Sequence, residues 1–300
     1  MKKFLLLFAI SGQFIFAQQI QIQSIDQLKN IEPSGLFHPA FSPSGDYLLA
    51  TAENYAGLKL YSFSDKTIKT LTTDPGAGYG VQISADGNNI VYKKNEFVKN
   101  LKHTSLISFS RSNGKQTQLV SPTRELITPR FAANKAQFVV GRKLVRNNVT
   151  ITESTPVICI ENQKMVLYSG NSRKVLTPNG EQASYICPSI SPDKKNIVYM
   201  VAGKGTFVCR MDGSNVKSLG KLNAPVWLNS KWLVGMDDKD DGQKMLSSSL
   251  IALTIDGKTR QTLSTPTGKM AMYPAASADG SRIAFNTENG ELYLMNIQIK

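Results

Sequence analysis

The chain has 300 residues, of which 41% are hydrophobic, and a formal net charge of +13. This composition is that of a folded globular protein and excludes a disordered or fibrous one. Three cysteines are too few, and odd in number, for the disulfide framework of a small secreted domain, so we expect buried free thiols at Cys159, Cys187 and Cys209.

The first 17 residues have the layout of a secretory signal peptide. Lys2 and Lys3 precede an apolar run over residues 4–10, and Ala17 supplies a small residue for cleavage. The run is much shorter than the roughly 20 residues that a membrane-spanning helix needs, and no long apolar segment follows it. We therefore expect a periplasmic protein that is exported, is cleaved near Ala17 and spans no membrane.

A short motif recurs six times along the remaining residues, 18–300, which we expect to form a single domain. Its anchor position is occupied by Ser42, Ser84, Ala132, Ser191, Leu228 and Ser277. In five copies a proline stands three residues earlier: Pro39, Pro129, Pro188, Pro225 and Pro274. After the anchor come a polar turn, an apolar strand, a variable loop, a second strand, an Asp-Gly or Asn-Gly turn and a last strand. Such turns supply the positive φ angles of tight hairpins.

Four short strands per copy, evenly punctuated by turns, are typical of a β-propeller blade. The sequence therefore predicts an all-β, six-bladed β-propeller of four-stranded antiparallel blades. The predicted blade cores lie near residues 37–72, 79–120, 127–177, 186–219, 223–263 and 272–297.

The last copy lacks its outermost strand, because the chain ends in its third strand. Residues 19–28 alternate polar and apolar side chains and belong to no other copy. We expect this N-terminal strand to complete the last blade and close the ring, which removes an exposed sheet edge.

The pattern in "SADGNNIVY", "SPDKKNIVY" and "SADGSRIAF" resembles the WD40-like (PD40) repeats of TolB-like six-bladed propellers. The resemblance covers about residues 37–297. TolB is a periplasmic component of the Tol–Pal envelope system, so the resemblance implies a six-bladed propeller that binds other proteins at the cell envelope.

The motifs of common enzymes are absent from the sequence. It contains no HExxH, no GxSxG and no phosphate-binding glycine loop, and its two histidines, His38 and His103, are too few for a three-histidine metal site. We therefore predict a non-enzymatic protein without a cofactor.

An acidic stretch partly resembles a calcium-binding loop. Its carboxylates are Asp237, Asp238, Asp240 and Asp241. Lys239 and Ser248 occupy positions where an EF-hand needs ligands, which excludes that motif. A looser cation site stays a hypothesis, and the alternative is a solvated loop.

Long variable loops on one face of the propeller are the expected binding region. They span residues 93–104, 141–155 and 237–248. Two of them are basic, with Lys93, Lys94, Lys99 and Lys102 in the first and Arg142, Lys143 and Arg146 in the second. Aromatic candidates for the same face are Tyr79, Phe97, Tyr185 and Tyr273.

These residues predict a monomeric propeller that binds a protein or envelope component. We expect the partner to be acidic where it contacts the basic loops. Nucleic acid is not an expected partner after export. Two alternatives stay open: a propeller enzyme that acts on glycans or lactones with a bound divalent cation, and a structural subunit of a secretion or cell-surface assembly.

Overall fold

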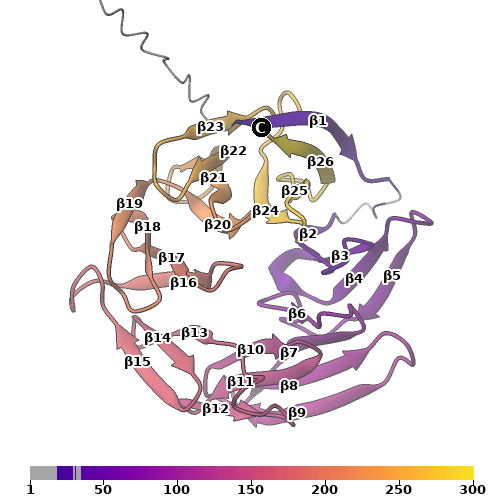
Figure 1. The fold of residues 1–300 in the computed structure, drawn as a ribbon. Helices are drawn as coiled ribbons and strands as arrows, with labels where there is room; N and C mark the ends of the chain where they lie inside the picture. The colour runs from indigo at the N-terminus through magenta and orange to yellow at the C-terminus, as the bar shows by residue number, and fades with distance from the viewer. Residues whose placement is uncertain (1–18, 30, 32–34) are drawn as a thin grey trace, which may run out of the picture.

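The computed structural model describes residues 19–29, 31 and 35–300. The regular secondary structure of this part is β-strand, apart from one 3₁₀ turn at Glu53–Tyr55. The strands form seven antiparallel sheets around a ring (Figure 1). The all-β propeller predicted from the repeats is therefore confirmed. Within the described residues no helix is long and apolar enough to cross a membrane. The predicted signal peptide lies outside them.

Five blades have four strands each, and in four of them the strands follow sequence order from the ring axis outward. The first has β2 (Phe37–Phe41), β3 (Tyr47–Thr51), β4 (Leu58–Ser62) and β5 (Ile68–Thr72). The second has β6 (Gln82–Ile83), β7 (Asn89–Val98), β8 (Leu101–Ser110) and β9 (Gln116–Thr123). The fifth has β16 (Tyr185–Ile190), β17 (Asn196–Val201), β18 (Gly205–Arg210) and β19 (Lys217–Gly220). The sixth has β20 (Asn223–Trp227), β21 (Trp232–Asp240), β22 (Met245–Thr254) and β23 (Arg260–Leu263).

The ring has seven blades, so the prediction of six is wrong. The stretch predicted as one blade over residues 127–177 forms two three-stranded sheets. Blade three has β10 (Ile127–Ala132), β11 (Lys135–Val140) and β12 (Lys143–Arg146). Blade four has β13 (Val157–Glu161), β14 (Lys164–Ser169) and β15 (Ser172–Leu176). Blade four begins without the proline and anchor serine, so the repeat alignment did not detect it.

Strand β13 runs opposite to the other innermost strands. Its end at Glu161 lies near the β11–β12 turn, since Arg142 is 3.9 Å from the Glu161 carboxylate. Beyond that end, the carbonyl of Gln163 accepts a hydrogen bond from Tyr185, the first residue of β16. Blade three thus lacks an outermost strand, and blade four starts with a strand of inverted direction. Six strands therefore make two blades where the sequence spacing suggests one.

The N-terminal strand closes the ring, as predicted. β1 (Ile20–Gln27) pairs antiparallel with β26 (Leu292–Ile299) and completes the seventh blade, which also has β24 (Met272–Ala276) and β25 (Arg282–Asn286). Ile20 lies opposite Ile299 and is buried. The pairing satisfies the backbone groups along the edge of β26, which would otherwise be an exposed strand edge.

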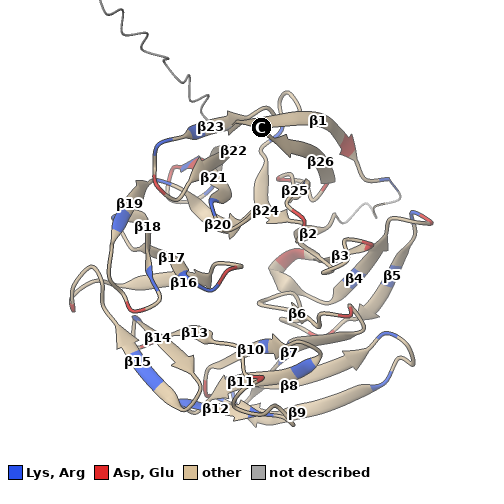
Figure 2. Ribbon diagram, in the orientation of Figure 1, with Lys and Arg blue, Asp and Glu red and all other residues tan. Residues whose placement is uncertain are grey.

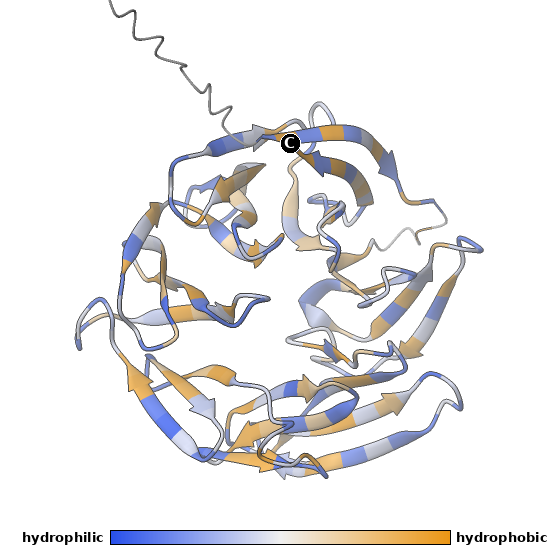
Figure 3. Ribbon diagram, viewed as in Figure 1, coloured by the Kyte–Doolittle hydropathy of each residue, from blue (hydrophilic) through white to orange (hydrophobic). Residues whose placement is uncertain are grey.

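The hydrophobic core is divided among the spaces between neighbouring blades. Alternation of apolar and polar residues along the strands is visible in Figure 3. One repeat position in the second strand of a blade holds a fully buried aromatic residue in three copies: Tyr92, Tyr199 and Phe285. Burial of a side chain of this size contributes about 2–3 kcal/mol, so the repeat maintains the packing between blades.

The anchor serine stabilises the first turn of a blade. The hydroxyl of Ser191 donates to the Asp193 carboxylate at 2.6 Å and accepts the backbone N–H of Asn196 at 2.9 Å. The same pair of bonds is made by Ser42, Ser84 and Ser277. The Ser and Asp of the motif therefore have a structural role, and they satisfy each other in a buried turn.

Candidate functional site

Two long hairpins extend from the blades on the face where second and third strands join. β7 and β8 stay paired out to Val98 opposite Leu101, and β21 and β22 out to Asp240 opposite Met245. Residues 93–104 and 237–248 are therefore paired strands joined by short turns, and the prediction of irregular loops there is wrong. The ladder gives these polar segments partners for their backbone N–H and C=O groups.

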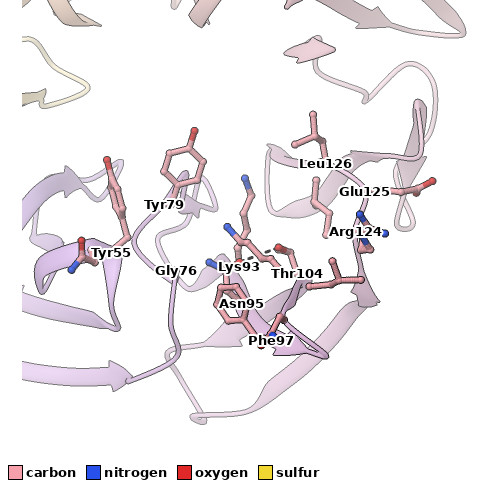
Figure 4. Close-up of a pocket in the computed structure, with 15 residues that line it drawn as sticks. Tyr55, Gly76, Tyr79, Lys93, Asn95, Phe97, Thr104, Arg124, Glu125 and Leu126 are labelled. Carbon is pink, nitrogen blue, oxygen red and sulfur yellow. Dashed lines mark hydrogen bonds between the residues drawn. The ribbon is translucent and has the colours of Figure 1, made fainter. Parts of the chain in front are cut away.

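The β7–β8 hairpin forms one wall of a cavity of about 620 Å³. The segment around Tyr55 and Tyr79 supplies a second wall, and residues 124–127, between β9 and β10, supply a third (Figure 4). Elements from the first three blades therefore meet here. The cavity includes four of the predicted binding residues: Tyr79, Lys93, Phe97 and Lys102.

Lys93 and Lys94 point to opposite sides of β7, as neighbouring residues of a strand do. The Lys93 ammonium lies 4.9 Å from the centre of the Tyr79 ring, within the cavity. Burial lowers the pKa of Lys93 to about 8, and the Lys102 charge contributes to this shift. Lys94 instead pairs with Asp74 at 3.2 Å. The structure therefore assigns only one of the two adjacent lysines to the cavity.

Large apolar side chains surround this cavity. Phe97 is 73% exposed and Leu126 is 70% exposed, and Tyr79, Val98 and Leu101 are also exposed. Leu126 was not predicted from the sequence, and neither were Tyr55 and Arg124. They belong to connections outside the repeat motif, and only the folded ring brings them together.

The second basic group is divided between the two ends of β12. Arg142, in the β11–β12 turn, lines a smaller cavity of about 260 Å³ with Glu161, and Lys143 is exposed beside it. Arg146 lies at the far end, where its guanidinium donates to the carbonyl of Gly170. The placement of Arg146 on the binding face is therefore wrong, because three residues of extended strand separate it from the turn. Basic residues elsewhere are spread over many blades (Figure 2).

Lys99 and Tyr185 do not line the main cavity. Lys99 forms the tip of the β7–β8 hairpin and is exposed. Tyr185 is fully buried, and its hydroxyl accepts the backbone N–H of Asn179 at 2.7 Å. The interpretation of Tyr185 as a partner-binding residue is wrong, because its side chain belongs to the core between blades four and five.

Four aromatic rings form a continuous group from the ring axis to the cavity: His38, Tyr55, Tyr79 and Tyr273. The ring of His38 lies 4.3 Å from that of Tyr55 and 4.1 Å from that of Tyr273. Tyr55 contacts Tyr79 edge-on at 5.2 Å, and both line the cavity. Burial lowers the pKa of His38 to about 4, so the imidazole is neutral at physiological pH.

A recurring backbone feature places His38 and Tyr273. Each stands directly before the proline of the repeat and has a positive φ, and the pairing with the next strand shifts there. Cys187 and Ala224 occupy the same place in two other blades, also with positive φ. Such a backbone is uncommon for residues with side chains and marks a site held by the surrounding fold.

The three cysteines are free thiols. Cys159 and Cys209 are buried, as expected, and burial raises the pKa of each to about 12. Cys187 is exposed in β16, so the prediction that it is buried is wrong. The bulge before Pro188 turns it away from the regular alternation of the strand.

The acidic residues of the β21–β22 hairpin do not converge. Asp237 is 3.8 Å from Arg260, and Asp238 accepts a hydrogen bond from the Asn223 amide at 2.7 Å. The side chains of Asp240 and Asp241 accept backbone N–H groups within the turn. Among the described residues, no three His, Cys, Asp or Glu side chains are grouped as a metal site would require.

Comparisons with known proteins identify the fold. No family model matches the sequence, and no curated protein does. The β-propeller domain of Myceliophthora thermophila Cps50 (Swd1) aligns over 93% of this chain and 100% of its own, with 8% identity and a TM-score of 0.59. A putative TolB from Agrobacterium tumefaciens aligns over 94% of this chain and 98% of its own, with 16% identity and a TM-score of 0.56.

TolB from Acinetobacter baumannii aligns over 81% of this chain, with 16% identity and a TM-score of 0.54. This chain spans 57% of that protein's length. The resemblance to TolB seen in the sequence is therefore confirmed as a likeness of fold: the chain is a TolB-like β-propeller with seven blades.

Proposed function

We propose that this chain is a non-enzymatic binding module of the periplasm, and that a protein partner docks on the face that carries the β7–β8 hairpin. The observation that carries the proposal is the group of exposed apolar side chains around one cavity, with Phe97 and Leu126 the most exposed. Apolar groups gathered in this way on a soluble scaffold mark interaction sites. The TolB-like fold supports a role in protein interactions.

The chemistry of the cavity suits binding. It combines apolar and aromatic groups with Lys93, Lys102 and Arg124. Aromatic and Arg side chains are the residue types that most often anchor protein interfaces. General acid–base catalysis would instead use a positioned pair of titratable groups. Glu125 is the one carboxylate among the residues that line the cavity, and its side chain lies beside Gly141, turned toward blade three.

A crosslinked pull-down from cell envelopes tests the proposal. The double variant Phe97→Ser/Leu126→Ser should lose the proteins that the wild-type chain captures. Val216→Ser is the matched control, because Val216 is also exposed but precedes β19 on the opposite face. Retention of every captured protein by the double variant would show that the partner docks elsewhere.

A further inference from the structure

The cavity contains a cation with no anionic partner among the described residues. Lys93 enters it from β7 and contacts the face of the Tyr79 ring, and no described carboxylate lies within ion-pair distance of its ammonium. The neighbouring lysine, Lys94, shows the contrast, since Asp74 pairs with it on the other side of the strand. A partly desolvated ammonium without a counter-charge favours an anionic ligand.

The charged groups around Lys93 add to this preference. Lys102 extends from the paired strand β8, and Arg124 comes from the connection to blade three. The carboxylate of Glu125 points away from Lys93 in Figure 4. Three cations therefore line the space, and the one carboxylate that lines it is turned away from Lys93.

The apolar groups define the rest of the ligand. Phe97 and Leu101 lie on the hairpin, and Leu126 lies on the opposite wall. The cavity can therefore contact both a carboxylate and an apolar group of one ligand. We propose that this cavity binds an extended peptide segment of the partner, with an Asp or Glu side chain at Lys93 and Lys102 and a large apolar side chain next to it. This inference rests on the proposed function and adds the chemistry of the partner.

Proton linkage gives the site a measurable property. A bound carboxylate favours the charged form of Lys93, whose pKa is about 8 in the free protein. Binding therefore takes up a proton above pH 8, and affinity should fall about tenfold per pH unit there. Lys102, Arg124 and Glu125 are the other charged groups that line the cavity, with the Tyr79 ring on the remaining side.

The test is selection of a random peptide library displayed on phage against the full mature chain. Wild-type protein should enrich peptides in which Asp or Glu adjoins Phe, Leu, Trp or Met. Lys93→Gln should weaken the best selected peptide by roughly 10- to 100-fold. Lys94→Gln is the matched control and should bind as the wild type does. Lys93→Arg should bind without the pH dependence, because the guanidinium stays charged.

Three results with the selected peptides and the lysine variants would overturn the inference. They are enrichment without an acidic bias, equal affinity of Lys93→Gln, and a pH profile shared by the wild type and Lys93→Arg. Alginate, which offers carboxylates without apolar side chains, should compete poorly, and equal competition per carboxylate would exclude the peptide assignment. The envelope pull-down tests the proposed function separately. The variant Phe97→Ser/Leu126→Ser should lose a partner that docks on this face whether or not the partner is acidic.

Discussion

The side-chain amide of Gln261 binds both backbone groups of Ile20. Its nitrogen donates to the Ile20 carbonyl at 2.7 Å, and its oxygen accepts the Ile20 N–H at 2.9 Å. Gln261 belongs to β23 of the sixth blade, whereas Ile20 begins the strand that closes the seventh. The closing strand is therefore held by its own sheet and by the neighbouring blade.

Replacement of Gln261 should loosen this closure. Gln261→Ala removes both hydrogen bonds and leaves the partly buried backbone groups of Ile20 without them, which should cost about 1–3 kcal/mol of unfolding free energy. Urea denaturation measures the change. Gln116→Ala, at an exposed position of β9, should change stability by less than about 0.5 kcal/mol. Equal stability of the two variants would mean that the amide bonds do not hold the strand.

The anchor serine should also be stabilising where it is buried. Ser191→Ala leaves the Asn196 N–H and the Asp193 carboxylate without their shared partner and should cost about 1–3 kcal/mol. Ser214→Ala removes a similar Ser–Asp bond in an exposed turn and should cost much less. Matching urea midpoints for the two variants would argue against a structural role for the anchor.

The same substitution should change a pKa. The Ser191 hydroxyl is the main cause that lowers the pKa of Asp193. A carboxyl whose folded pKa is lowered stabilises the fold above its unfolded pKa, and this stability is lost as the pH falls through the folded value. In Ser191→Ala the pKa of Asp193 should rise toward about 3.8, as carbon-detected NMR titration would show. An unchanged midpoint would contradict the assigned hydrogen bond.

The sequence predicted the fold where the motif is intact. Ser42, Ser84, Ser191 and Ser277 each stand in the first turn of a blade, and the alternation of residues 19–28 predicted the closing strand. The blade count was wrong because the inverted strand β13 has no anchor of its own. A repeat search detects strands that share one direction and one turn, and blade four shares neither with its neighbours at its start.

The cavity was predictable only in part. Lys93 and Phe97 were predicted because they lie in a basic segment that was expected to be a loop, although it proved to be a paired hairpin. Tyr55 and Leu126 come from connections without a pattern, and only the ring brings them near the hairpin. The assignment of Tyr185 failed for the opposite reason: an aromatic residue near a loop has the same sequence context whether it points outward or into the core.

Thiol accessibility should separate the three cysteines. Cys187 is exposed, whereas Cys159 and Cys209 are buried with strongly raised pKa values. Folded protein should therefore react with Ellman's reagent at one thiol, and urea-unfolded protein at three. Although its surface is accessible, the surrounding protein partly desolvates the Cys187 thiol and raises its pKa, so its reaction should be slower at pH 7 than at pH 9. The folded Cys187→Ser variant should show no reactive thiol, and a native count of zero or three would contradict the assigned exposures.

His38 should make stability depend on pH between 4 and 6.5. Its pKa is about 4 in the folded protein because of burial, and about 6.5 in an unfolded chain. Between these values the unfolded chain binds a proton that the folded one does not, so stability falls as the pH falls through this window and is unaffected above it.

His38→Phe keeps an aromatic ring beside Tyr55 and Tyr273 but cannot titrate. Between pH 7 and pH 4 the melting temperature of the wild type should therefore fall further than that of His38→Phe. The carboxyl groups are the same in both proteins, so their titration does not contribute to this difference. Parallel melting curves, or an NMR midpoint for His38 near 6.5, would show that the imidazole is solvated and that the aromatic group at the ring axis is open to water.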